Sequence, residues 1–439
     1  EFEAIHNTEL YSAQFQDGAG RFAPGDRFLT LGDKPIRSRT DLAGELGKLA
    51  PAESITAQVL RAGEKLSITW TPFPAAGPEK SKALLPQVAR AIKPGKLLNI
   101  YHQLGFTFTG APLPRGQENL LGSTPLDESS SMNIPKGSYL LVLELEGRSP
   151  VRVPLVVPGS TADINVRIPK KVPAGFGYIP GGRFFAGGDD QSQARQNLEP
   201  FWYSEPGFFI SRLEVSFEDY LRFLNDPKVL AHTDKNGTAG TLADWSELKR
   251  QGLAGGSSRV SLIPQYNGRA LLGRRAGGSW ARLREVPPKG PLCGISMLAA
   301  LEYAHWYTGH RDDGFLYRLP TDLEWEKAAR GVDGRTHVWG EQPVGSFCRS
   351  EKSRWRDLLF PESRGVFPND ESVYGIRDLA GSVLEPTTSR TIGGYVSFRG
   401  GWYGTADDYL FHASTRFGRP ASSARHDAGI RLVAVRVNE

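Results

Sequence analysis

The sequence predicts an α+β protein in which short strands and long ordered loops outweigh helices. The chain has 439 residues, a length that favours two to four domains, each able to bury a core of its own. It contains 50 Gly and 31 Pro, together with 9 Trp, 14 Tyr and 22 Phe. This mixture is typical of turns, short strands and aromatic-packed loops rather than of a helical bundle.

Charge and cysteine content exclude several classes of protein. The formal net charge is only +5 and no run of Lys and Arg occurs, so we expect no nucleic-acid partner. No stretch reaches the roughly 18 apolar residues of a membrane helix, so we expect no span in this chain. Two cysteines, Cys293 and Cys348, exclude a disulfide scaffold or a cysteine-rich zinc site. The chain begins at Glu1 without a methionine or a signal-like segment, which suggests a processed form or a piece of a longer protein.

The first predicted domain covers residues 1–75. Alternating apolar residues predict strands at 27–31, 55–60 and 66–70, with a short helix at 41–49 between them. The order of turn, strand, helix and hairpin resembles the second half of a bacterial PDZ domain. The loop that receives a peptide carboxylate in that family is not readable here, so we expect a PDZ-like domain with a scaffold or docking role.

The second predicted domain, residues 76–172, combines a linker with a small β-sandwich. The linker is the Pro-, Ala- and Lys-rich stretch 74–94. Strands are predicted at 139–145 and 151–157, joined by a turn at 147–150. The pattern resembles the PEGA-type modules of bacterial envelope and signalling proteins, and we interpret it as a spacer.

The third predicted domain covers residues 173–439 and holds the clearest helix signals. Ser216 with Asp219, and Thr321 with Glu324, are capping boxes ahead of apolar residues at helical spacing. Ser296 is a candidate cap for a third helix at 297–306, and Gly331 is expected to end the second. Trp325 and Leu323 are expected to be buried. The polar loops of residues 225–290 are interpreted as an insertion.

An ordered series of motifs in this domain resembles the formylglycine-generating enzyme (sulfatase-modifying factor) family. The series comprises residues 177–184, 208–216, 317–331, 374–381, 398–401 and 429–432. The resemblance implies an elaborated C-type-lectin fold. The variants here look most like copies fused to bacterial signalling domains.

The family contains oxidases as well as non-catalytic binders, and the resemblance places this chain among the binders. The oxidases bind Cu(I) through two thiolates, which would fall near Thr405 and Leu410 here. A related branch binds iron through a close run of histidines, and the eight histidines of this chain do not form that run. A calcium site in the family corresponds to residues 381–386, where Glu385 is retained and Ser382 replaces an amide ligand. Glu385 is therefore a candidate calcium ligand, and no catalytic residue or other cofactor is expected.

The segment Tyr403–Val433 has an unusual composition, since it lacks Lys, Glu, Gln, Met and Trp. Replacement of the adenines in AAC or AAT codons cannot yield those five types. The segment thus resembles the C-terminal ends of variable proteins rewritten by diversity-generating retroelements. The alternative is accidental composition with GC-rich codon usage. The candidate ligand-binding residues are Tyr403, Thr405, Asp407, Asp408, Tyr409, Phe411, His412, Ser414, Phe417, Arg419, Ser422, Ser423, Arg425, His426 and Asp427.

These observations predict a non-catalytic recognition protein whose ligand is another protein, bound by an exposed surface at 403–427. Arg399, Gly400 and Arg431 are expected to be buried beneath that surface. Two alternatives stay open: the sensor portion of a bacterial signalling kinase or protease, and an oxidoreductase of the formylglycine-generating type. An upstream effector or signalling domain is an expected partner. We expect a bacterial protein, with the cytoplasm favoured over secretion.

Overall fold

The computed structural model describes a subset of the chain: residues 27–36, 45, 54–61, 64–70, 97–102, 120–125, 137–143, 149–157, 169–188, 197–198, 200–240, 259–341, 343–353, 362–391 and 393–436. The chain divides into two compact units, one of residues 1–84 with 158–164 and the other of residues 85–157 with 165–439. The domain boundaries expected at residues 75 and 172 stay a prediction.

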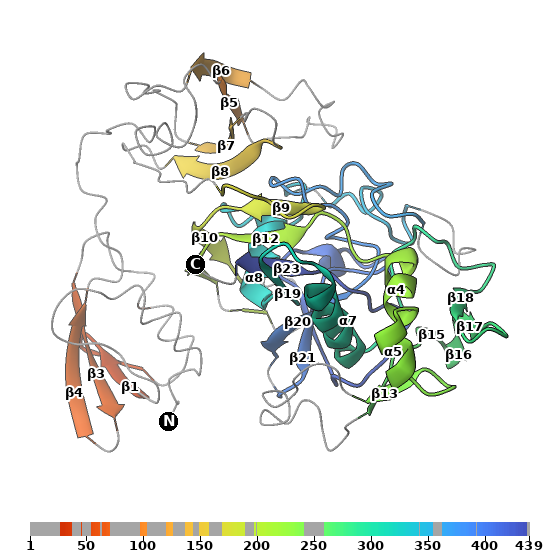
Figure 1. The fold of residues 1–439 in the computed structure, drawn as a ribbon. Coiled ribbons are helices and arrows are strands. Elements are labelled where there is room, and N and C mark those ends of the chain that lie inside the picture. The colour runs from red at the N-terminus through yellow and green to blue at the C-terminus, as the bar shows by residue number, and fades with distance from the viewer. Residues whose placement is uncertain are drawn as a thin grey trace. The chain divides into compact units, whose positions relative to one another are not determined.

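The first unit contains a four-stranded antiparallel sheet in the order β2-β1-β3-β4 (Figure 1). Its strands are β1 (Arg27–Leu31), β2 (Lys34–Pro35), β3 (Ile55–Arg61) and β4 (Glu64–Trp70). A small core of Leu31, Ile36, Ala57, Val59 and Ile68 packs on one face. The three strands expected here are confirmed. The helix expected at 41–49 lies, apart from Glu45, outside the described residues, and the PDZ-like assignment stays a prediction.

A second four-stranded antiparallel sheet, in the order β6-β5-β7-β8, precedes the C-terminal domain in the chain. Its strands are β5 (Leu97–His102), β6 (Leu120–Pro125), β7 (Gly137–Leu143) and β8 (Val151–Val157). The strand expected at 139–145 therefore begins two residues earlier, and its last two residues lie outside the described part. The described residues form one sheet here, and the β-sandwich stays a prediction.

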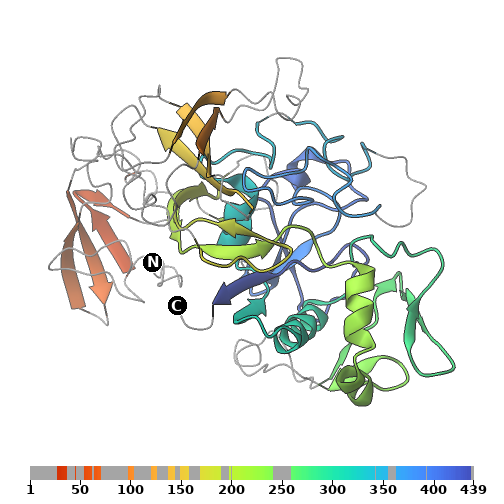
Figure 2. The same cartoon turned by 45° about the horizontal axis from the view of Figure 1, so that its top comes forward.

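The C-terminal domain is built around the antiparallel sheet β19-β23-β12-β9 (Figures 1 and 2). These strands are β9 (Phe176–Ile179), β12 (Phe208–Ser211), β19 (Phe315–Arg318) and β23 (Val433–Arg436). The final strand β23 pairs with β12 on one side and with β19 on the other. The sheet thus ties the beginning of the domain to its end.

Four α-helices are described in this domain; three of them begin where the sequence signals predicted, and the fourth lies within residues 225–290, which were expected to form polar loops. They are α4 (Phe217–Leu224), α5 (Pro227–His232), α7 (Met297–His310) and α8 (Asp322–Arg330). The two expected capping boxes, at Ser216 and Thr321, are confirmed, and Ser296 caps α7, which extends four residues beyond the expected end. Trp325 is fully buried as expected, whereas Leu323 is only half-buried because it lies on the outer side of α8.

Short two-stranded ribbons fill the space around these helices. They are β10 (Gly182–Ala186) with β11 (Phe201–Glu205), β13 (Thr238–Gly240) with β14 (Arg259–Ser261), β15 (Gln265–Tyr266) with β16 (Arg269–Ala270), and β17 (Leu272–Arg274) with β18 (Trp280–Arg282). Among the described residues, no helix is long and apolar enough to cross a membrane.

A three-stranded sheet, β20-β21-β22, lies around the candidate ligand-binding segment, residues 403–427. Its strands are β20 (Glu385–Arg390), β21 (Val396–Arg399) and β22 (Arg416–Arg419), and the short 3₁₀ helix η1 (Asp408–Phe411) lies between the last two. Gly400 has a φ of +76°, and a Cβ on Gly401 would lie 2.6 Å from the carbonyl oxygen of Ala380. Only glycines fit where the chain turns from β21 against the core.

Candidate functional site

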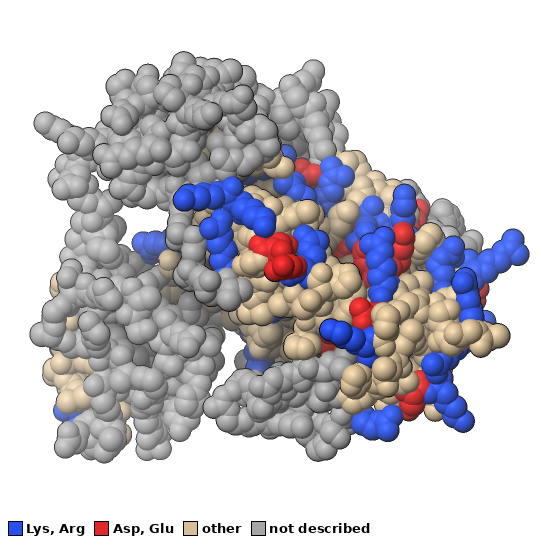
Figure 3. Space-filling model, in the orientation of Figure 1, with Lys and Arg blue, Asp and Glu red and all other residues tan. Residues whose placement is uncertain are grey.

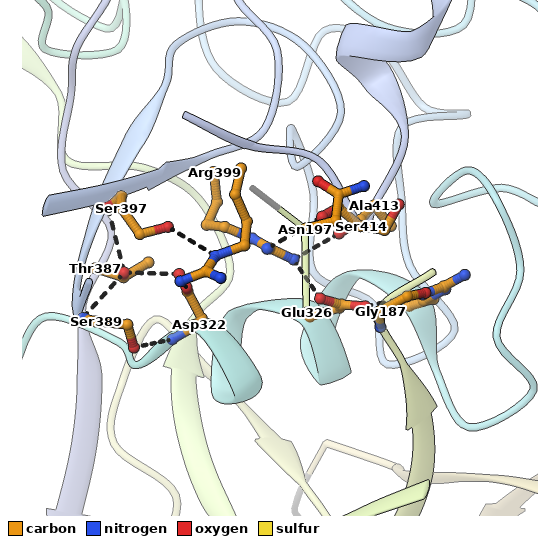
Figure 4. A network of polar contacts seen from close by, with 12 residues as sticks. Gly187, Asn197, Asp322, Glu326, Thr387, Ser389, Ser397, Arg399, Ala413 and Ser414 are labelled. Carbon is orange, nitrogen blue, oxygen red and sulfur yellow. Dashed lines mark hydrogen bonds and ion pairs between the residues drawn. The ribbon is translucent and has the colours of Figure 1, made fainter. Parts of the chain in front are cut away.

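The segment 402–427 is anchored from beneath by Arg399, whose side chain is fully buried at the end of β21 (Figure 4). Its Nη2 donates to Glu326 Oε2 of α8 at 2.7 Å and to the carbonyl oxygen of Ala413 at 2.7 Å, and its Nη1 donates to that of Ser414 at 3.3 Å. The guanidinium also faces the ring of Trp325, 5.1 Å from its centroid. Charge-assisted hydrogen bonds of this kind are short and directional, so they fix the middle of the segment to α8.

A second buried ion pair holds the segment where β22 begins. Arg416 Nη2 lies 2.5 Å from Asp322 Oδ2, at the start of α8. Thr387 donates its hydroxyl to the other oxygen of Asp322 at 2.8 Å, and Ser397 accepts a hydrogen bond from Arg416 Nε (Figure 4). The base of the segment is therefore a network of salt bridges and hydrogen bonds between α8, β20, β21 and β22.

Glu385, the candidate calcium ligand, lies in a third buried ion pair. Both of its carboxylate oxygens accept hydrogen bonds from Arg431 Nε at 2.8 Å, and one accepts a bond of 2.6 Å from Trp325 Nε1. Arg431 donates further to the carbonyl oxygens of Ser211 and Arg377, each at 2.8 Å. A calcium ion would need six to eight oxygens, and here a guanidinium already occupies the carboxylate. The residues present do not fit a calcium site at Glu385.

The two positions that correspond to the oxidases' thiolates hold Thr405 and Leu410, and both are buried. The cysteines of the chain, Cys293 and Cys348, are free and buried at other places in the sequence. Burial raises the pKa of both thiols, so neither is a thiolate near neutral pH. The described loop therefore offers no sulfur ligand at either position.

Six of the fifteen candidate ligand-binding residues are buried, so the expectation of an exposed surface is wrong for them: Tyr403, Thr405, Phe411, His412, Ser414 and Asp427. The physical reason is that a domain poor in helices and strands builds its core partly from loop side chains. Phe411, only 1% exposed, packs in one of the two large core clusters together with Ala413. The expected burial of Arg399, Gly400 and Arg431 is confirmed.

The other nine candidates reach the surface to different degrees. Three are exposed: Asp407, Ser422 and Arg425. Six are half-buried: Asp408, Tyr409, Phe417, Arg419, Ser423 and His426. Their role in ligand binding stays a prediction.

Part of this set joins two further aromatic residues in what we call the aromatic–arginine face, defined as Tyr266, Trp402, Phe417, Arg419, Arg425 and His426. The rings of Trp402 and Phe417 meet edge to face at 6.0 Å, and those of Tyr266 and His426 lie 5.1 Å apart. Tyr266 comes from β15, in the predicted insertion, and Trp402 lies just outside the expected segment. Sequence reasoning did not place either residue beside the others, because contacts between loops distant in sequence leave no local pattern.

The arginines of this face are held by one buried carboxylate. Arg419 donates to both oxygens of Asp427, at 2.6 and 2.9 Å, and Arg425 Nε lies 3.7 Å from Asp427 Oδ1. The bidentate geometry fixes the direction of Arg419. Arg425 keeps 53% of its side chain exposed and presents its guanidinium to solvent.

A further residue that sequence reasoning missed is His337, which the fold brings against Asp408 and His412. His337 is buried, and burial lowers its pKa, so its imidazole is neutral at pH 7. The sequence analysis did not group His337 with Asp408 and His412, because it lies far from both of them in the chain.

Comparison with known proteins agrees with this arrangement of motifs. The profile of the sulfatase-modifying factor enzyme 1-like domain matches residues 165–436. A protein named inactive C-alpha-formylglycine-generating enzyme 2, from Bos taurus, is 26% identical over 278 residues, which cover 58% of this chain and 86% of that protein. A protein named formylglycine-generating enzyme, from Thermomonospora curvata, is 27% identical over 261 residues, covering 52% and 76%. The relatives thus include proteins named as inactive and as enzymes.

Among solved structures, Treponema denticola variable protein 1 matches with a TM-score of 0.30 and 16% identity over 59% of this chain and 94% of that one. The profile match spans more than half of the chain and includes every motif that the resemblance rested on. The chain therefore belongs to the family of sulfatase-modifying factor enzyme 1-like domains.

Proposed function

We propose that the C-terminal domain is a non-catalytic recognition module that binds a polypeptide ligand through the aromatic–arginine face. The observation that carries this proposal is the convergence of half-buried aromatic rings and arginines on rigid supports. Trp, Tyr and Arg side chains dominate the binding energy of many protein interfaces. Aromatic rings supply a large contact area at a low cost in conformational entropy.

The supports of this face favour recognition by a preorganised surface. Phe417 and Arg419 lie on β22, whose register against β21 runs from Arg416 to Arg419. Trp402 and Phe417 also pack against a large core cluster, so each ring is held on one side. A surface fixed in this way loses little freedom when it binds.

The charge distribution favours a polypeptide over a nucleic acid. On the face of the described residues that Figure 3 shows, Lys and Arg side chains are interspersed with Asp, Glu and uncharged residues. Nucleic-acid binding relies on basic side chains gathered into a patch or stripe. The arginines of the aromatic–arginine face instead share the carboxylate of Asp427, which leaves a mixed surface.

Oxidase chemistry of the formylglycine-generating type is not part of this proposal. Cu(I) prefers thiolate or thioether ligands, and Thr405 and Leu410 offer neither. Retroelement diversification of the segment would be compatible with folding only at the exposed and half-buried positions, since core replacements cost about 2–5 kcal/mol each. A reverse transcriptase beside the gene, with a near-copy of codons 403–433 that differs at adenines, would support diversification.

The experiment is a selection from a random peptide library on the whole chain, followed by binding measurements. The test variant is F417A/R425A/H426A. The control is R222A, which removes an exposed arginine of α4 that forms ion pairs with Glu218 and Asp219 of the same helix and lies outside the face. We expect enriched peptides to bind the unaltered chain and R222A equally, and the triple variant at least tenfold more weakly. Equal binding to all three proteins, or no enrichment on the unaltered chain, would contradict the proposal.

A further inference from the structure

Three side chains with metal-ligating atoms converge where η1 meets the turn that contains His337. His337 Nε2 lies 3.3 Å from Asp408 Oδ2, and His412 Nε2 lies 3.2 Å from the same oxygen. One ligand atom from each residue lies within 4.8 Å of the other two. The two imidazole rings meet nearly perpendicularly, with centroids 4.9 Å apart.

The backbone places these residues with little freedom. His337 exchanges two backbone hydrogen bonds with Gly340, at 2.8 and 3.1 Å, and its ring stacks on that of Trp339. Asp408 opens η1, and His412 follows its last residue. The Ala413 amide donates to the carbonyl oxygen of Thr336 at 2.8 Å, which joins the two segments next to the cluster. Main-chain hydrogen bonds therefore help to preorganise the cluster, in addition to the contacts among its own side chains.

The ring of His337 lacks hydrogen-bond partners of its own. It is 1% exposed, and within the part of the chain that the structure describes neither Nδ1 nor Nε2 has a hydrogen-bond partner, although Nε2 points toward Asp408. The same holds for Asp408 Oδ1. Burying polar atoms without partners is costly, so native structures seldom leave them so without a ligand, ion or water to satisfy them.

The spacing of the donors fits a metal ion of the first transition row. Bonds of about 2.0–2.1 Å to imidazole nitrogen and carboxylate oxygen place two ligands of a tetrahedral ion about 3.3 Å apart. The two distances from Asp408 Oδ2 have this length, and the ligand atoms of the two histidines lie within 4.8 Å of each other. Two imidazoles and one carboxylate form a donor set that zinc and iron(II) accept and that magnesium and calcium do not prefer.

We propose that His337, Asp408 and His412 form a binding site for a divalent transition-metal ion, with zinc as the first ion to test. Three protein ligands leave a coordination position open. The Asp408 side chain keeps 30% of its surface exposed, which gives a water molecule or an anionic group of a ligand a side from which to approach the cluster. This inference does not rest on the recognition function, because the aromatic–arginine face contributes none of the three ligands.

The first experiment titrates metal-free chain, without an affinity tag, with Co²⁺ and follows the ligand-field absorption bands, with Zn²⁺ as competitor. The test variants are D408N and H412Q, and the matched control is H305Q, which removes an exposed histidine outside the cluster. We expect one Co²⁺ per chain in the unaltered protein and in H305Q, and at least tenfold weaker binding in both test variants. Binding that is absent from the unaltered chain, or equal in all four proteins, would overturn the proposal.

A second measurement needs no variant and so does not depend on how a variant folds. X-ray absorption of the zinc-loaded unaltered chain reports the elements bound to the metal. We expect only nitrogen and oxygen neighbours, with the scattering pattern of two imidazoles. A sulfur neighbour would place the ion at Cys293 or Cys348, and an oxygen-only shell would place it on surface carboxylates. Either result would overturn the assignment.

Discussion

Removal of the Arg431 guanidinium should destabilise the C-terminal domain far more than removal of the Arg425 guanidinium, because Arg431 is fully buried and Arg425 is largely exposed. Arg431 is fully buried, and it donates to Glu385 and to three main-chain carbonyl oxygens. The change Arg431→Ala leaves the buried Glu385 carboxylate with the hydrogen bond from Trp325 Nε1 but without its guanidinium partner. Breaking one side of a buried ion pair costs about 3–5 kcal/mol.

The matched change Arg425→Ala removes a guanidinium that is mostly exposed and 3.7 Å from its carboxylate. Exposed substitutions and surface ion pairs usually change the free energy of unfolding by less than about 1 kcal/mol. At about 2–4 °C per kcal/mol for a domain of this size, Arg431→Ala should lower the thermal midpoint by about 6–20 °C, and Arg425→Ala by no more than about 4 °C.

Tryptophan fluorescence during urea unfolding suits this comparison, because Trp70 is the only one of the nine tryptophans before residue 165. The signal therefore reports mainly on the C-terminal domain. The double variant E385Q/R431M should lose less stability than the sum of the two single changes, since it leaves no unpaired buried charge. Equal free energies of unfolding for Arg431→Ala and Arg425→Ala would refute the reasoning.

Three other outcomes are expected. Thr321→Ala removes the N-cap of α8 and should cost about 1 kcal/mol in urea unfolding; an unchanged midpoint would remove the capping assignment. Burial raises the pKa of Glu214, and raises those of Asp370 and Asp378 to about 7. These groups bind protons on folding, so their stabilisation is complete below the unfolded pKa of about 4 and is lost as pH rises through about 7. The thermal midpoint should fall as the pH rises from about 5 to 7.5, and less steeply in E214Q; a flat or rising midpoint over this range would contradict this. A Cys-x-Pro-x-Arg peptide incubated with the chain, copper and oxygen should keep its thiol in mass spectrometry, whereas conversion to the aldehyde would make the domain an oxidase.

Local signals in the sequence predicted three of the four described helices of the C-terminal domain and missed α5. A capping box satisfies main-chain amides within one helical turn. The pairs Ser216 with Asp219 and Thr321 with Glu324 can therefore be recognised from four consecutive residues. The motif series likewise predicted the family, and the burial of Arg399 and Arg431 followed from it.

The burial of the 403–427 side chains was not predictable in the same way. A segment of mixed aromatic and small polar residues can lie on the surface or pass through the core. Its composition does not distinguish these two positions. Phe411 and Phe417 are the same residue type in the same segment, yet only Phe411 is buried. The difference comes from Arg399, which holds the main chain next to Phe411 against α8.

The contacts of the candidate site could not be predicted either, because they join residues that lie far apart in the sequence. Glu385 matches a calcium ligand of the family by position, but its partner Arg431 lies 46 residues later and decides what the carboxylate does. Tyr266 and His337 reach the segment from other parts of the fold, where nothing in their local sequence points to it. Such groupings depend on the folded topology, which a single sequence does not display.

The most direct test of the recognition function is hydrogen–deuterium exchange of the unaltered chain with and without a peptide selected on it. The proposal predicts that the bound peptide slows amide exchange at residues 265–267 and 417–427, which carry the aromatic–arginine face, and leaves exchange in helix α4 unchanged. Slower exchange confined to other segments, with 417–427 unaffected, would contradict the claim that this face binds the ligand.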